Sequence, residues 1–175
     1  IERAWDHVKT HYDGQLAPAI PAVGEKFVRN HAFWNRPRPV PKCFSHNDFR
    51  PDNMLFGGPG ERVAVVDWQT SNFLGSGMDV AYFLGAIFPP EARRANERAL
   101  LRGYHAALVE QGVANYGFDD LLRDYAHYSF AMIAVAVAAT LIVKRTARGD
   151  RLFMHMITGA ARQALDNQAL DLLPE

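Results

Sequence analysis

The sequence has little cysteine and no excess of charge of either sign. Cys43 is the single cysteine among 175 residues, which excludes an intramolecular disulfide and a cysteine-based zinc site. The 19 basic and 19 acidic side chains balance to a formal net charge of zero, whereas proteins that bind nucleic acid usually carry a basic excess. We therefore expect no nucleic acid as a partner and a reducing compartment, the cytoplasm, as the location.

We expect no targeting segment and no membrane-spanning run in this sequence. Residues 1–7 have neither the basic nor the apolar stretch of a secretory signal. Residues 128–143 form an uncharged apolar stretch, but it is shorter than the roughly 18–20 residues that cross a bilayer and is rich in alanine. We expect this stretch to be a buried core helix, and we expect no membrane as a partner.

Helical patterns dominate what is present, and the chain length predicts a single domain over residues 1–175. The expected helices cover residues 2–12, 18–34, 79–88, 90–112, 118–147 and 150–169. Between the second and third helices, alternating prolines at Pro37, Pro39 and Pro41 predict an extended connector.

A small β unit follows this connector. Residues 42–45 are a short strand candidate, and two apolar runs, 54–56 and 63–66, flank a glycine-rich turn and predict a hairpin. We expect Trp68 and Phe73, just beyond it, to lie in the core. The predicted fold class is therefore α+β, mainly α, with helices around a small hairpin.

Three polar side chains fall at one end of the predicted hairpin. Asp48 and Asn53 precede its first strand, and Asp67 directly follows its second. Antiparallel neighbours bring the start of one strand to the end of the other. Magnesium takes hard oxygen ligands and needs only one or two from protein when phosphates supply others. The pattern predicts Asn53 and Asp67 as metal ligands and Asp48 as the proton acceptor in phosphoryl transfer from ATP.

Neighbouring residues leave alternatives open. His46 fits a structural histidine better than a catalytic one. Asp79 can cap the following helix or brace the loop, and one carboxylate can do both. Arg50 can contact a phosphate or substrate carboxylate, or it can pair with Asp52 or a backbone carbonyl.

The spacing of these residues resembles a known family. The runs that carry the resemblance are His46-Asn-Asp-Phe-Arg-Pro-Asp-Asn53, Val66-Asp-Trp-Gln69 and Gly77-Met-Asp79. Together they resemble the C-terminal lobe of the aminoglycoside phosphotransferase and choline kinase family, whose fold is protein-kinase-like. Asn47, where many members have glycine, and Gln69 are closest to its ecdysteroid-kinase-like and bacterial phosphotransferase-family branches.

The resemblance implies a role for each residue of the motif. Asp48 matches the catalytic aspartate, and Asn53 and Asp67 match the magnesium ligands. His46 and Asp79 match residues that support the catalytic loop. The implied cofactors are ATP and Mg²⁺, and the implied substrate is a hydroxyl group on a small molecule, bound between the catalytic loop and the helices of residues 90–169.

One part of the family pattern is missing. Complete members have an N-terminal lobe with a nucleotide-covering loop and a strand lysine, whereas Lys9, Lys26 and Lys42 here lie in helix or connector contexts. The glycine-rich residues 57–60 join two strands and predict a hairpin turn, not a phosphate cradle. We therefore expect a C-terminal lobe that lacks its N-terminal lobe in cis and is inactive alone.

Other functions stay open. The lobe can be a non-catalytic module that binds a small molecule or a protein, or, with thinner support, a metal-dependent phosphoesterase. The intact set of Asp48, Asn53 and Asp67 favours the kinase. Acidic residues at 119, 120 and 124 resemble an aminoglycoside-binding cluster, but they fit a helix start better.

Overall fold

The computed structural model describes residues 1–12 and 14–175, without the side chain of Ala86. The elements in chain order are α1 (Glu2–His11), α2 (Ala19–Arg29), α3 (His31–Trp34), β1 (Lys42–Ser45), the 3-10 turn η1 (Pro51–Asn53), β2 (Met54–Leu55), β3 (Ala64–Val65), η2 (Trp68–Thr70), β4 (Asn72–Gly75), α4 (Gly77–Ile87), α5 (Pro90–Glu110), α6 (Phe118–Ile142), α7 (Ala147–Asp166) and η3 (Ala169–Leu172). The predicted class, α+β and mainly α, is confirmed.

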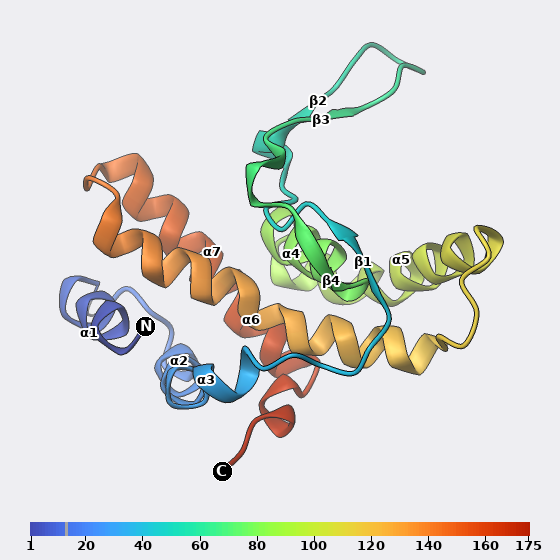
Figure 1. The fold of residues 1–175 in the computed structure, drawn as a ribbon. Helices are drawn as coiled ribbons and strands as arrows, with labels where there is room; N and C mark the ends of the chain where they lie inside the picture. The colour runs from blue at the N-terminus through green and yellow to red at the C-terminus, as the bar shows by residue number, and fades with distance from the viewer. Residues whose placement is uncertain (13) are drawn as a thin grey trace.

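The helix α6 is the centre of the fold. It runs through the molecule in Figure 1, with α7 and α4 packed along it and α1 against its C-terminal half. Its fully buried side chains include Leu121, Phe130, Ile133 and Val137. By length and composition alone α6 could cross a membrane, and in the described part of the chain it is the one such helix. Other elements bury 61% of its most apolar stretch, in agreement with the expected core helix.

The predicted helix over 18–34 is wrong in one respect, because it divides at Asn30. The backbone N–H of Asn30 donates to the carbonyls of Lys26 and Phe27, and its side-chain amide also donates to the Lys26 carbonyl. Asn30 has a φ of −102° and a ψ of 7°, and its side chain satisfies one of the last carbonyls of α2. The helix therefore stops, and α3 starts at His31.

The predicted helix over 118–147 is also too long. It ends at Ile142, and α7 begins at Ala147, before the predicted start at residue 150. The Thr146 hydroxyl accepts a hydrogen bond of 3.0 Å from the backbone N–H of Gly149. A threonine in this position caps a helix N-terminus. The Thr146 cap therefore fixes the start of α7 at Ala147, which helical periodicity alone did not predict.

The predicted hairpin is confirmed. Strands β2 and β3 are antiparallel, with Met54 opposite Val65 and Leu55 opposite Ala64. The hairpin projects away from the helices in Figure 1. Its turn is closed by the Glu61 carboxylate, which accepts a hydrogen bond of 2.7 Å from the backbone N–H of Gly58.

Strands β1 and β4 form a second two-stranded sheet, of which the sequence predicted β1 but not β4. The strand β4 pairs antiparallel to β1, from Lys42 opposite Gly75 to Ser45 opposite Asn72. The expectation that Trp68 and Phe73 lie in the core is wrong, since they are 45% and 62% exposed. Both rings contact Phe44 of β1 on the outside of the molecule, with centroids 5.8 and 5.6 Å away.

Candidate active site

The loop between β1 and β2, residues 46–53, is held in place by the first turn of the helix α4. This loop is called the site loop from here on. The carboxylate of Asp79, in the first turn of α4, accepts hydrogen bonds from the backbone N–H groups of His46, at 2.7 Å, and Asn47, at 2.9 Å. Asn47 has a left-handed backbone with φ of 66°, which asparagine tolerates better than most residues. The two charge-assisted bonds therefore fix the sharp turn that begins the loop.

His46 connects the site loop to the hairpin. Its ring is fully buried. The Nδ1 atom accepts from the backbone N–H of Asp48 at 3.3 Å, so Nε2 carries the hydrogen and donates to the carbonyl of Val66 at 2.8 Å. The imidazole is thus a neutral brace between two segments, which is a structural role.

Asn53 orients the carboxylate of Asp48. The amide nitrogen of Asn53 donates to the backbone carbonyl and to the carboxylate Oδ2 of Asp48, each at 2.8 Å. Because both bonds use the nitrogen, the side-chain oxygen of Asn53 is left as an acceptor. Asn53 is 6% exposed, so the side chain that holds Asp48 is buried within the site loop.

Arg50 pairs with two carboxylates of the same loop. Its Nε lies 3.2 Å from Oδ1 of Asp48, and a terminal nitrogen lies 3.1 Å from Oδ2 of Asp52. Of the alternatives that the sequence left open, the structure therefore shows the pairing with Asp52 and adds one with Asp48. Among the described residues, Arg50 is the cationic side chain that forms an ion pair with the Asp48 carboxylate.

Asp67 lies at the same end of the hairpin as Asn53. The backbone N–H of Val66 donates to the carbonyl of Asn53 at 3.0 Å, so the residue after Val66 emerges beside the site loop. Asp67 is exposed and has a left-handed backbone with φ of 66°. Among the described residues, its carboxylate takes part in no hydrogen bond or ion pair, and no group of three or more His, Cys, Asp or Glu side chains could hold a metal. One carboxylate and one amide oxygen are nevertheless a sufficient protein share for magnesium bound with phosphates.

Two further residues belong to this site. The Thr70 hydroxyl donates to the carbonyl of His46 at 3.1 Å, and the Thr70 carbonyl accepts from the side chain of Asn47 at 3.2 Å. Tyr82, one turn after Asp79 on α4, is 1% exposed, and its hydroxyl lies against the Asp48 carboxylate without a hydrogen bond of regular geometry in the described chain. Burial, and then the negative charge of the nearby Asp48 carboxylate, raise the pKa of Tyr82.

Sequence reasoning missed both residues for different reasons. Thr70 lies in η2, outside the motif spacing, and carries no pattern that marks it. Tyr82 stands three residues after Asp79, so helical spacing puts the two on one face of α4. That spacing was a usable signal for Tyr82, but an aromatic residue in an apolar helix is most often simply core.

Comparison with protein families relates the chain to known enzymes. A model of the phosphotransferase enzyme family matches residues 2–116, which is 115 of the 175 residues and contains every residue of the site described above. Neither the curated proteins nor the solved structures contain a match to the chain.

Proposed function

Because the chain belongs to the phosphotransferase enzyme family, we propose that it is the catalytic lobe of a small-molecule kinase, with a protein-kinase-like fold. It would transfer the γ-phosphate of ATP to a hydroxyl group. One observation carries this proposal: the Asn53 amide nitrogen holds both the backbone and the carboxylate of Asp48. That contact fixes a carboxylate in place and turns an amide oxygen toward a possible metal.

The donor set fits magnesium. The free oxygen of Asn53 and the unpaired carboxylate of Asp67 lie at the same end of the hairpin, and both are hard ligands. These two residues would hold the ion, which neutralises phosphate charge when it is bound with ATP. Asp48 would accept a hydrogen bond from the acceptor hydroxyl and take its proton as the oxygen attacks phosphorus. Arg50 could then move from Asp48 and Asp52 onto a phosphate oxygen.

A nucleotide lobe in the same chain would complete this site. Several large apolar side chains on and beside the hairpin are exposed, namely Phe44, Leu55, Phe56, Val63, Trp68 and Phe73. An apolar patch of this kind marks a surface that another structure covers. Its position beside Asp67 supports the proposal that an N-terminal lobe packs there and grips the far side of the nucleotide.

The test is ATP consumption by the full-length protein, screened with hydroxylated metabolites, sterols and antibiotics. In the presence of an accepted substrate, we expect Asp48→Ala to lower kcat by at least ~100-fold, the range of general-base catalysis, while Mg-ATP binding is retained. We expect Asp67→Ala to lose the dependence on magnesium. Asp119→Ala is the control and should change neither, because Asp119 is exposed in the first turn of α6 and its carboxylate makes no hydrogen bond or ion pair within the described part of the chain.

Near-normal turnover by Asp48→Ala would contradict the assignment. The alternative function is a non-catalytic module that binds a small molecule or a protein. It predicts that no hydroxyl compound is phosphorylated by the full-length protein, and that Asp48→Ala leaves ligand binding unchanged.

A further inference from the structure

A cavity of about 430 Å³ opens beside the site loop. Its walls come from the proline connector, the β1–β4 sheet and the middle of α6, and it reaches the site loop at Asn47, the residue before Asp48. Small-molecule sites have volumes of roughly 300–1,000 Å³. Asp48, Asn53 and Asp67 do not line the cavity, so it lies on the Asn47 side of the site loop, apart from the two candidate metal ligands.

The charge on the cavity wall has one sign. Arg36, Arg38 and Lys42 line it, and no Asp or Glu is among its lining residues in the described chain. Arg38 is matched by Asp124, whose carboxylate is 2.7 Å away and 1% exposed. For the part of the chain that the structure describes, neither Arg36 nor Lys42 has a carboxylate within 4.0 Å. The wall therefore presents two uncompensated positive charges.

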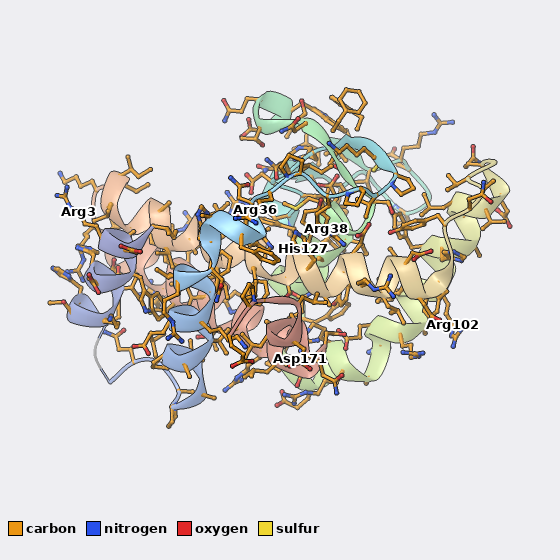
Figure 2. The ribbon with its side chains drawn as sticks, turned by 60° about the horizontal axis from the view of Figure 1, so that its bottom comes forward. Arg3, Arg36, Arg38, Arg102, His127 and Asp171 are labelled. Atoms are coloured by element: carbon orange, nitrogen blue, oxygen red, sulfur yellow. The ribbon has the colours of Figure 1, made fainter. Side chains whose placement is uncertain are left out.

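Next to these cations, the cavity wall includes a stacked pair of uncharged rings, Trp34 and His127. Figure 2 shows His127 beside Arg36 and Arg38, where the connector meets α6. The His127 ring stacks on Trp34 with centroids 5.4 Å apart. Burial, and then the charge of Arg38, lower the pKa of His127 to about 3, so the imidazole is neutral near pH 7. The stacked pair offers a planar surface next to the two cations.

The acidic residues of α6 do not face this space. The Asp120 carboxylate accepts from the backbone N–H of Gly117 at 2.9 Å and so caps the helix. The Asp124 carboxylate is held by Arg38 on one oxygen and by the Tyr116 hydroxyl on the other, at 2.8 Å. Asp119 and Asp120 are exposed at the start of α6, and none of the three acidic residues lines the cavity, so the cluster does not offer a cationic acceptor a site there.

We propose that this cavity binds the acceptor of phosphoryl transfer, and that the acceptor is a hydroxyl compound carrying a carboxylate or another anionic group. That the bound compound is the phosphoryl acceptor rests on the proposed kinase function. Arg36 and Lys42 hold the anionic group, the Trp34–His127 pair contacts the apolar part, and the hydroxyl faces the site loop. A cationic acceptor of the aminoglycoside kind would meet like charge there.

The test uses three benzyl alcohols of similar size whose para substituents are anionic, neutral and cationic. They are 4-(hydroxymethyl)benzoate, 1,4-benzenedimethanol and 4-(aminomethyl)benzyl alcohol, titrated calorimetrically into the full-length protein at low ionic strength. We expect the carboxylate to bind about tenfold or more tightly than the other two, since a hydrogen bond to a charged group is worth about 1.5–3 kcal/mol. Raising the salt concentration reduces the preference.

Variants locate the effect. Arg36→Gln and Lys42→Gln should each weaken binding of the carboxylate several-fold and leave that of the neutral diol unchanged, and the double variant should remove the preference. Arg62→Gln, on the exposed hairpin turn outside the cavity, is the matched control and should change nothing. Both cavity side chains are exposed, so these variants are expected to fold, which circular dichroism checks.

The outcomes separate this inference from the proposed function. Equal binding of the three probes, tighter binding of the amine, no binding of any probe, or a preference insensitive to Arg36→Gln and Lys42→Gln overturns the inference, whatever the kinase assay shows. A preference for the carboxylate that depends on both cations supports it. Phosphoryl transfer that persists in Asp48→Ala overturns the proposed function instead, and that assay does not depend on the binding data.

Discussion

At the scale of single residues, the site depends on hydrogen bonds between groups far apart in sequence. Asp79 holds the backbone of His46 and Asn47, and His46 in turn reaches Val66. The spacing of the motif predicts which residues carry the chemistry. It does not predict that Asp48 is held by Asn53 and Arg50 at once, because that depends on how the loop folds back on itself.

Tyr82 gives a test at this scale. Its hydroxyl is buried beside the Asp48 carboxylate without a hydrogen bond of regular geometry, and a buried polar group that is poorly satisfied is unfavourable. We therefore expect Tyr82→Phe to leave the free energy of unfolding unchanged or to raise it by up to ~1 kcal/mol. The measurement is urea denaturation followed by circular dichroism.

The matched control is Tyr125→Phe. Tyr125 is equally buried, but its hydroxyl donates to the Glu97 carboxylate at 2.9 Å. Removing it should lower the free energy of unfolding by about 1–2 kcal/mol. Equal destabilisation by Tyr82→Phe and Tyr125→Phe would contradict this prediction. It would mean that the Tyr82 hydroxyl forms a stabilising hydrogen bond in solution, with the nearby Asp48 carboxylate as the candidate acceptor.

At the scale of elements, the site depends on how closely α4 approaches α6. A Cβ added at Gly77 would lie 2.7 Å from backbone atoms of Asp124 and Tyr125 on α6. Two helices can come this close only where one of them has no side chain. Gly77 therefore sets the position of the α4 N-terminus, and with it the Asp79 carboxylate that holds the site loop.

Gly77→Ala should consequently be destabilising. Backbone atoms cannot move aside as a flexible side chain can, so we expect a loss of about 1–3 kcal/mol in the free energy of unfolding. Gly103→Ala is the control, because Gly103 lies within α5 and a Cβ there meets nothing within 4 Å. Alanine at that position should stabilise the helix by up to ~1 kcal/mol. Equal effects of the two substitutions in urea denaturation would refute the close approach of α4 and α6.

At the scale of the whole molecule, the structure has a buried helical part and an exposed apolar hairpin side. Phe56 is 67% exposed and follows β2 on the projecting hairpin. If a nucleotide lobe covers this side, Phe56→Ser should weaken ATP binding by the full-length protein several-fold. In the 175-residue chain alone, the same change should alter the free energy of unfolding by less than ~0.5 kcal/mol.

Val109→Ser is the control for this prediction. Val109 is 52% exposed, near the C-terminal end of α5 and away from the hairpin. We expect it to alter neither the ATP affinity of the full-length protein nor the stability of the shorter chain. Equal ATP affinities for the Phe56 and Val109 variants would argue against a lobe on the hairpin side.

The sequence by itself determined the local features of this protein. The hairpin, the proline connector and the positions of most helices follow from alternation, φ restriction and helical periodicity, all of which act over a few residues. The order Asp48, Asn53, Asp67 around a hairpin also sufficed to place Asn53 and Asp67 at one end, because an antiparallel register is a local property.

Only the tertiary structure decided the rest. The strand β4 exists because it pairs with β1 about thirty residues earlier in the chain, and no local pattern encodes that partner. Trp68 and Phe73 look like core residues by composition, yet both rings are exposed and contact Phe44 on the outside of the molecule. The charge of the cavity was decided the same way: Asp124 faces Arg38 across the fold and leaves Arg36 and Lys42 uncompensated. Charge compensation depends on distance in space, so the basic cavity beside the site loop appears only once the chain is folded.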